Sequence, residues 1–222
     1  MAGKVFFSVS MSLDGFTAPV PVDALLAPPE QWDQHPELEH WLAQWMELQA
    51  WIFPQRFFRE NLHIGEGGEE GRDNDIARET FERTGASIMG KRMFDFGEAA
   101  WPKEAPFHTD VFVVTHQQRD PWVVPGGTSF HFVNDGIHSA LDRARDAAGD
   151  RDVRIAGGAE TILQYLNAGL VDEFTIALAP VLFGAGGSLF DGVDASRIAL
   201  EQIRSEQPSP RATHLTYAVR KR

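Results

Sequence analysis

The sequence has 222 residues, enough to bury one sizeable core, and 43% of them are apolar, as is ordinary for a soluble globular protein. Its formal net charge of −12 argues against nucleic-acid binding, because proteins hold phosphate backbones mainly with Lys and Arg. It has no cysteine, which excludes disulfides and thiolate metal sites, and neither a membrane-length apolar run nor a signal peptide is visible. We therefore expect a cytoplasmic protein without a metal site that contacts neither membranes nor nucleic acid.

The first predicted element is a strand over residues 4–10. It is apolar on both faces, which is typical of a strand in the centre of a sheet. Residues 12–15 then break the pattern as a loop. Residues 19–30 contain four prolines, so we expect irregular backbone there.

An aromatic-rich segment follows at about residues 36–58, and we predict that it is helical. Several of its apolar side chains have the spacing of one helix face: Leu38, Trp41, Leu42, Trp45 and Leu48. We interpret this face as core or subunit contact rather than as a surface that stacks on a ligand. Residues 65–75 are rich in glycine and acids, and we expect them to form a mobile loop that could act as a lid.

Strands and helices alternate in the rest of the chain. The predicted helices cover residues 75–84, 92–96 and 135–148, with a last one that ends near residue 169. The predicted strands cover residues 87–89, 111–115, 130–133, 153–156, 173–178 and 213–219. The last two alternate apolar and polar residues and should pair antiparallel near one edge. This order predicts an α/β fold with a mostly parallel sheet and antiparallel strands at the C-terminal end.

The most informative motif is the pair Gly157 and Gly158 between a predicted strand and a predicted helix. Glycines have no Cβ, so a bulky ligand can lie against their backbone. The helix that follows presents free N–H groups and the positive end of its dipole at the same place. Such a turn can bind phosphate oxygens, although many strand-to-helix turns need glycine for packing alone.

A second strand ends at Gly90, and Lys91 and Arg92 begin the next helix. Cations at a helix N-terminus are unfavourable unless an anion offsets them, so this pair indicates a function. The alternative is that the two cations pair with nearby acids such as Asp95 or Glu98.

A third strand end carries Thr115, His116 and Arg119. Their hydroxyl, imidazole and guanidinium groups could bind a phosphate monoester, such as the one on the adenosine ribose of NADP. The alternative is a solvated turn. Three anion sites on neighbouring strands would fit a dinucleotide, but the glycine spacing of a Rossmann protein and that of a P-loop are both absent.

Five segments in this order carry a family resemblance: residues 10–18, 89–94, 113–116, 155–159, and 170–173 with 179–190. Together they resemble the dihydrofolate-reductase-like superfamily, most closely the branch related to the C-terminal reductase domain of bacterial riboflavin biosynthesis. The resemblance covers nearly the whole chain outside about residues 28–75. It implies one three-layer α/β domain over residues 1–222, with helices on both faces of the sheet and an insertion at about 28–75. It also implies that the domain binds NADPH and forms a homodimer.

The same resemblance implies where the cofactor lies. The segment from Gly90 would run along its phosphates, Thr115 and His116 would meet the adenosine, and the segment from Gly157 would wrap the diphosphate and ribose. The loop from Ser12 to Ala18 would close over the nicotinamide and exclude water. The cofactor-binding residues that the resemblance implies are Ser12, Ala18, Gly90, Lys91, Arg92, Met93, Thr115, His116, Gly157, Gly158, Ala159, Glu160 and Thr161.

Two departures leave the substrate open. Dihydrofolate reductases grip the pterin with a carboxylate on the first helix, and no residue here aligns with it. The riboflavin-pathway enzymes bind a ribose phosphate with basic residues, for which the inserted segment offers four candidates: Arg56, Arg59, His63 and Arg72.

We therefore expect an NADPH-dependent reductase that acts on a C=O or C=N bond of a small polar substrate, as in the 5-amino-6-(5-phosphoribosylamino)uracil reductases of the riboflavin pathway. A dihydrofolate-reductase-like activity and a non-catalytic nucleotide-binding dimer are the alternatives. Asp14 is the first candidate for the proton donor, because its loop should lie beside the nicotinamide. An Asp-Gly pair is also an ordinary turn, and water could supply the proton instead.

Overall fold

The computed structural model describes residues 3–20 and 37–222, so most of the stretch predicted to be irregular lies outside the described residues. The strands are β1 (Val5–Ser12), β2 (Phe16–Ala18), β3 (Thr84–Gly90), β4 (Asp110–Val114), β5 (Trp122–Val124), β6 (Thr128–Val133), β7 (Asp152–Gly157), β8 (Glu173–Ala179), β9 (Gly187–Ser188), β10 (Ile198–Ser209) and β11 (Ala212–Lys221). The helices are α1 (Glu37–Leu48), α2 (Arg56–Asn61), α3 (Arg72–Glu82), α4 (Lys91–Ala100), α5 (Ile137–Ala148) and α6 (Ala159–Asn167).

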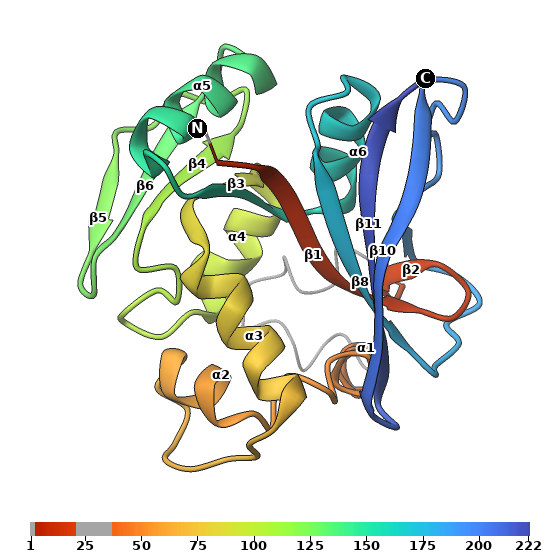
Figure 1. Ribbon diagram of the computed structural model, residues 1–222. Coiled ribbons are helices and arrows are strands. Elements are labelled where there is room, and N and C mark those ends of the chain that lie inside the picture. The colour runs from red at the N-terminus through yellow and green to blue at the C-terminus, as the bar shows by residue number, and fades with distance from the viewer. Residues whose placement is uncertain (1–2, 21–36) are drawn as a thin grey trace.

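Within the described ranges, nine strands form one sheet in the order β10-β11-β8-β1-β7-β3-β4-β6-β5 (Figure 1). The strands from β8 to β6 run parallel, and β11 and β10 extend one edge antiparallel. β1 lies between β8 and β7 near the middle, as its apolar faces predict. The prediction of a mostly parallel sheet with antiparallel C-terminal strands is therefore confirmed.

Helices cover both faces of this sheet. On one face α5 and α6 pack on β3, β4 and β7, and side chains such as Leu141, Ile155 and Tyr165 form the larger core cluster. On the other face α4 packs through Phe94 on β3 and β4, and α3 and α1 approach from the side that is lowest in Figure 1. No helix of the described part of the chain combines the length and the apolar character needed to cross a membrane.

The inserted segment is more structured than its composition predicts. The aromatic stretch divides into α1 and α2, and Leu42 is 39% exposed although the helix-face pattern placed it with the buried Leu38 and Trp41. The loop before α3 is anchored to the chain beside it, because the Arg56 amide donates to the Glu69 carbonyl at 2.9 Å.

The helix predicted from residue 75 begins three residues earlier, at Arg72. Two polar residues of its first turn are buried in compensated contacts. The Asp73 carboxylate lies 2.8 Å from Nε2 of His214, and the Asn74 side-chain oxygen accepts the Phe57 amide at 2.8 Å. The prediction of a mobile loop is therefore wrong for residues 72–75, where tertiary partners outweigh the polar composition.

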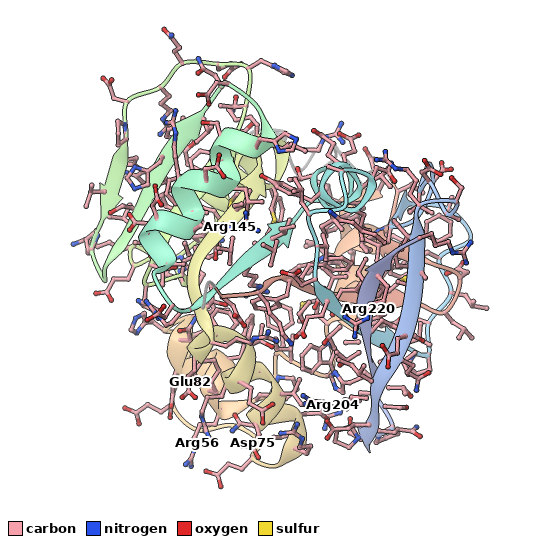
Figure 2. All side chains as sticks on the ribbon, turned by 45° about the horizontal axis from the view of Figure 1, so that its top comes forward. Arg56, Asp75, Glu82, Arg145, Arg204 and Arg220 are labelled. Atoms are coloured by element: carbon pink, nitrogen blue, oxygen red, sulfur yellow. The ribbon has the colours of Figure 1, made fainter. Side chains whose placement is uncertain are left out.

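The edges of the large sheet contain two strands that the sequence pattern did not predict. β5 pairs antiparallel with β6 at one edge. β10 forms the other edge, where Leu200 and Ile203 are about half exposed among charged neighbours. Arg204 of β10 lies between the β10–β11 hairpin and α3, 3.7 Å from Glu79 (Figure 2). An edge strand with solvent on much of its surface has no apolar periodicity to recognise.

Candidate functional site

A cleft of about 1270 Å³ opens where β3, β4 and β7 end. In parallel sheets, ligands bind beyond these carboxyl ends of the strands. Two walls of the cleft differ in chemistry. The glycine wall consists of Gly90, Gly157 and Gly158 with the first turns of α4 and α6, and the aromatic wall consists of Trp45, Trp51, Phe53, Phe58 and Phe81.

The glycine wall brings two helix N-termini together. Gly90 precedes α4 and Gly158 precedes α6, and neither helix start has a side-chain cap hydrogen bond. A Cβ on Gly90 would collide with the hydroxyl of Thr161 in the first turn of α6, so only glycine lets the two turns lie this close. Their uncapped N–H groups and positive dipole ends favour an anion at this place.

Gly157 and Gly158 have different roles in this wall. Gly157 has a φ of +136°, and a Cβ there would lie 2.9 Å from the sulfur of Met93. A side chain at Gly157 would therefore strain the backbone. Gly158 has a φ of −71°, and a Cβ there would meet nothing within 4 Å. Gly158 is thus open to the cleft, and any group added to it would occupy ligand space rather than disturb the fold.

The cations of the glycine wall are paired. Lys91 forms an ion pair with Asp95, and Arg92 lies 3.6 Å from Glu160 of α6. The pairing of Lys91 with Asp95, given above as the alternative interpretation, is thus present. Both cations still line the cleft and stay half-exposed, so an incoming anion can compete for them.

The adenosine cluster predicted after β4 is divided by the structure. Thr115 and His116 line the cleft. Arg119 is outside its described lining, because its guanidinium pairs with Glu98 at 2.6 Å and packs 4.8 Å from the ring centre of Phe132. The prediction that Arg119 joins these two residues around a phosphate is therefore not supported.

Ser12 and Asp14 are also outside the described lining of the cleft, whereas Ala18 is part of it. The Ser12 hydroxyl donates to Asp14 at 2.6 Å, and the Asp14 carboxylate accepts the backbone amides of Phe183 and Gly184. A small loss of solvent raises the pKa of Asp14, but these hydrogen bonds outweigh it and leave the pKa below its ordinary value. Asp14 therefore ties its own loop to the loop after β8.

The aromatic wall was not predicted to face a ligand. Trp41 is buried, as expected for core, and its indole donates to the Pro19 carbonyl at 3.0 Å. Trp45 packs on Trp41 and against Phe53, and it lines the cleft with both of them. A planar ring could stack on these side chains, so the face has a surface role that its helical spacing alone does not reveal.

The sheet contributes polar groups between the two walls. Ser10 of β1 donates to the Gln49 side-chain oxygen and accepts the Trp51 indole, both at 2.9 Å. Behind Trp51 the ring of His214 packs edge-on at 4.6 Å. Burial lowers the pKa of His214, although Asp73 opposes this by favouring the charged ring. The contacts of Ser10 and His214 with Trp51 hold this part of the aromatic wall in place.

Arg154 of β7 lines the same cleft and is a charged site residue that sequence reasoning missed. A single charged residue between Val153 and Ile155 fits an ordinary alternating strand pattern. The signal that could have identified it is its position directly before the Gly157–Gly158 turn, in a strand that lies inside the sheet, where an arginine needs a partner.

Comparison with known proteins shows which sequences and structures this chain resembles. YyaP of Bacillus subtilis (strain 168), an uncharacterized protein, is 34% identical over 86 residues, which make up 39% of this chain and 45% of YyaP, so the match spans less than half of this relative. A Shewanella sp. PV-4 protein named for riboflavin biosynthesis has a similar structure, with a TM-score of 0.59 and 21% identity over 98% of this chain and 99% of that one.

Two further solved structures share the architecture. Dihydrofolate reductase of Enterococcus faecalis, complexed with NADP(H), matches with a TM-score of 0.52 and 12% identity over 99% of this chain and 98% of that one. The Thermotoga maritima diaminohydroxyphosphoribosylaminopyrimidine deaminase/5-amino-6-(5-phosphoribosylamino)uracil reductase matches with a TM-score of 0.55 and 12% identity, over 98% of this chain and 56% of that one. These structures show the dihydrofolate-reductase-like fold. The sequence model of the RibD C-terminal domain matches residues 3–213, and the chain therefore belongs to the RibD C-terminal domain family.

Proposed function

We propose that this protein is an NADPH-dependent reductase that transfers a hydride to a C=O or C=N bond of a small polar substrate. The observation that carries the proposal is the glycine wall, where two uncapped helix N-termini and an open Gly158 face one cleft. A ligand with a diphosphate suits this wall, because each helix start can bind phosphate oxygens. The family membership and the NADP(H)-bound neighbour support the same cofactor class.

The residues of the cleft fit such a cofactor. Ala159, Glu160 and Thr161 would bind the diphosphate through backbone amides, and Lys91 and Arg92 would exchange part of their present pairing for the phosphates. Thr115 and His116 lie at the end of β4, where the adenosine would extend. When bound, NADPH supplies the hydride, and the protein supplies orientation and exclusion of water.

The aromatic wall would serve the substrate. Its ring faces offer stacking to a planar heterocycle and exclude water from the reacting carbon, which strengthens every polar contact in the cleft. Ser8 and Ser10 of β1 lie on the cleft side of the sheet and offer hydroxyl groups there. We therefore propose a small heterocyclic substrate, of which the riboflavin-pathway uracil intermediates are one class.

Reduction of folate is less well supported. The carboxylates among the described lining residues are Glu160 and Asp191, and neither belongs to the aromatic wall. A pterin ring is held in dihydrofolate reductases by such a carboxylate, so the chemistry of this wall differs.

Asp14 remains the proton donor named from the sequence, but we propose that it positions a loop instead. Its lowered pKa keeps it ionised at neutral pH, and it accepts hydrogen bonds that a protonated carboxyl would lose. Water is then the simplest source of the proton.

The direct test is calorimetric titration of NADPH into the protein and into Gly158→Val. The valine side chain would enter open cleft space, so we expect the affinity to fall at least 100-fold while the unfolding temperature without ligand stays within about 2 °C of the parent. Gly158→Ala is the matched control and should lose less affinity. Equal binding by the parent and Gly158→Val would refute the placement of the diphosphate.

A further inference from the structure

A partly buried arginine faces the cleft without a counter-charge. Arg154 lies in β7, where it pairs with Phe6 of β1 and Ser87 of β3, so it is flanked by strands on both sides. Its neighbours Val153 and Ile155 point into the opposite core. The arginine side chain therefore lies on the face that bounds the cleft, in a region where charged groups are rare.

The guanidinium has little to bind within the protein. Among the described residues it has no hydrogen-bond or ion-pair partner, and its Nε is buried and unsatisfied. The guanidinium packs on the ring of Phe81, whose centre lies 5.0 Å away. Burial lowers the pKa of Arg154 to about 10, so the group is still charged at neutral pH.

Arg83 faces the same side of the sheet and is an arginine whose charge is neutralised by acids of the protein. It lies 2.5 Å from Asp152 and 2.7 Å from Glu173, and it also packs on a ring, that of Phe6 at 4.1 Å. Arg154 has the ring but lacks the acids. A partly buried cation with no acid beside it and a buried, unsatisfied Nε is unfavourable, which indicates that its partner is supplied by something that enters the cleft.

The hydroxyl groups around the cleft limit what that partner can be. The Ser10 hydroxyl proton is used by Gln49, and the Thr80 hydroxyl donates to the Ile76 carbonyl at 2.9 Å. On the sheet face beside Arg154, the hydroxyl of Ser8 is then the further donor that lines the cleft. The guanidinium fork matches the two oxygens of a carboxylate and neutralises its single charge, whereas a phosphate dianion would keep a second charge unneutralised there.

We propose that Arg154 binds a carboxylate of the substrate. This inference rests on the proposed function for the identity of the ligand as a substrate, but the binding itself does not require NADPH. Arg154 and Ala156 are two residues apart on one face of β7, about 7 Å along the strand. A substrate carboxylate bound at Arg154 would then lie about the width of one small ring from the substrate carbon at the glycine wall. The substrate class is therefore a carboxylated heterocycle or aromatic ring.

The test uses three probes that differ in charge, namely benzoate, benzamide and phenyl phosphate, with binding measured by ligand-observed NMR on the full chain without cofactor. We expect benzoate to bind at least ten times more tightly than benzamide. Arg154→Met should remove this preference, and Arg154→Lys should retain part of it. Arg143→Met is the matched control, because Arg143 pairs with Asp135 on the exposed side of α5, and it should leave the preference unchanged.

Equal affinities for benzoate and benzamide, or a preference that survives in Arg154→Met, would overturn the inference. Tighter binding of phenyl phosphate than of benzoate would overturn the assignment to a carboxylate. NADPH titration of the same samples separates this inference from the proposed function. A preference for benzoate over benzamide without NADPH binding would refute only the reductase proposal. NADPH binding without that preference would refute only the role of Arg154.

Discussion

Replacing Arg154 by methionine should make the ligand-free protein more stable. Burial lowers the pKa of Arg154 well below the ordinary arginine value, to about 10. One pKa unit corresponds to about 1.4 kcal/mol, so the buried charge costs the folded state about 3 kcal/mol. The contact with Phe81 returns about 1 kcal/mol of this, which leaves a net cost of about 2 kcal/mol.

Methionine fills a similar volume and packs well on aromatic rings, so Arg154→Met should recover most of that cost. For a chain of this size we expect the unfolding temperature to rise by about 4 to 8 °C. The measurement is thermal unfolding of the parent and variant at pH 7, with coincident fluorescence and circular-dichroism transitions to establish two-state behaviour.

Arg83→Met is the control of opposite sign. It removes a cation that neutralises Asp152 and Glu173, so it should destabilise the protein by about 3 kcal/mol. If Arg154→Met is instead less stable than the parent by 1 kcal/mol or more, the guanidinium is compensated within the protein, and the reasoning about an incoming anion fails.

Three further predictions concern the cleft and its supports. Lys91→Ala combined with Arg92→Ala should weaken NADPH binding about tenfold at low salt and less at high salt, as titrations at 0.05 and 0.5 M NaCl would reveal; a salt-independent loss would speak against phosphate contacts. Asp14→Asn should lower the free energy of unfolding by about 1 kcal/mol and leave the pH profile of turnover unchanged, whereas loss of one limb of that profile would restore Asp14 as proton donor. The pKa of His214 is lowered in the folded state, so its contribution to stability is complete above about pH 6.5 and is lost as the pH falls below it. Melting curves from pH 8 to 5 should show this loss in the parent and a flatter profile in His214→Phe; identical profiles would exclude His214 as its source.

The parallel centre of the fold could be predicted because its strands are buried on both faces. β4 reads as a short apolar run, and the order of strands and helices implies parallel pairing. β10 could not be predicted in the same way, because polar and charged residues follow one another without a regular apolar spacing along an edge that faces solvent. The start of α3 was missed for a different reason, since Asp73 is buried only because His214 lies beside it in the folded chain.

Some residues of the candidate site could also be predicted from the sequence, and others could not. The turns at Gly90 and Gly157 could be found because a glycine before a helix is a local signal, and the structure brings both turns to one cleft. Arg154 and Trp45 could not be assigned to a ligand from spacing, because the same spacing occurs in ordinary strands and helices. Asp14 is the opposite case, in which the sequence indicated a role that the structure does not support. Its loop position indicated a catalytic role, but its carboxylate accepts hydrogen bonds from backbone amides of the loop after β8.

The central claim is that the first turns of α4 and α6 hold a pyridine nucleotide at Gly157 and Gly158. A crystal structure of the protein grown with NADP⁺ tests this most directly. The account predicts density for the diphosphate against the amides of Ala159 to Thr161, with the nicotinamide ring turned toward Ala18 and the aromatic wall. A nucleotide bound elsewhere, or crystals that stay free of it at millimolar concentration, would contradict the account.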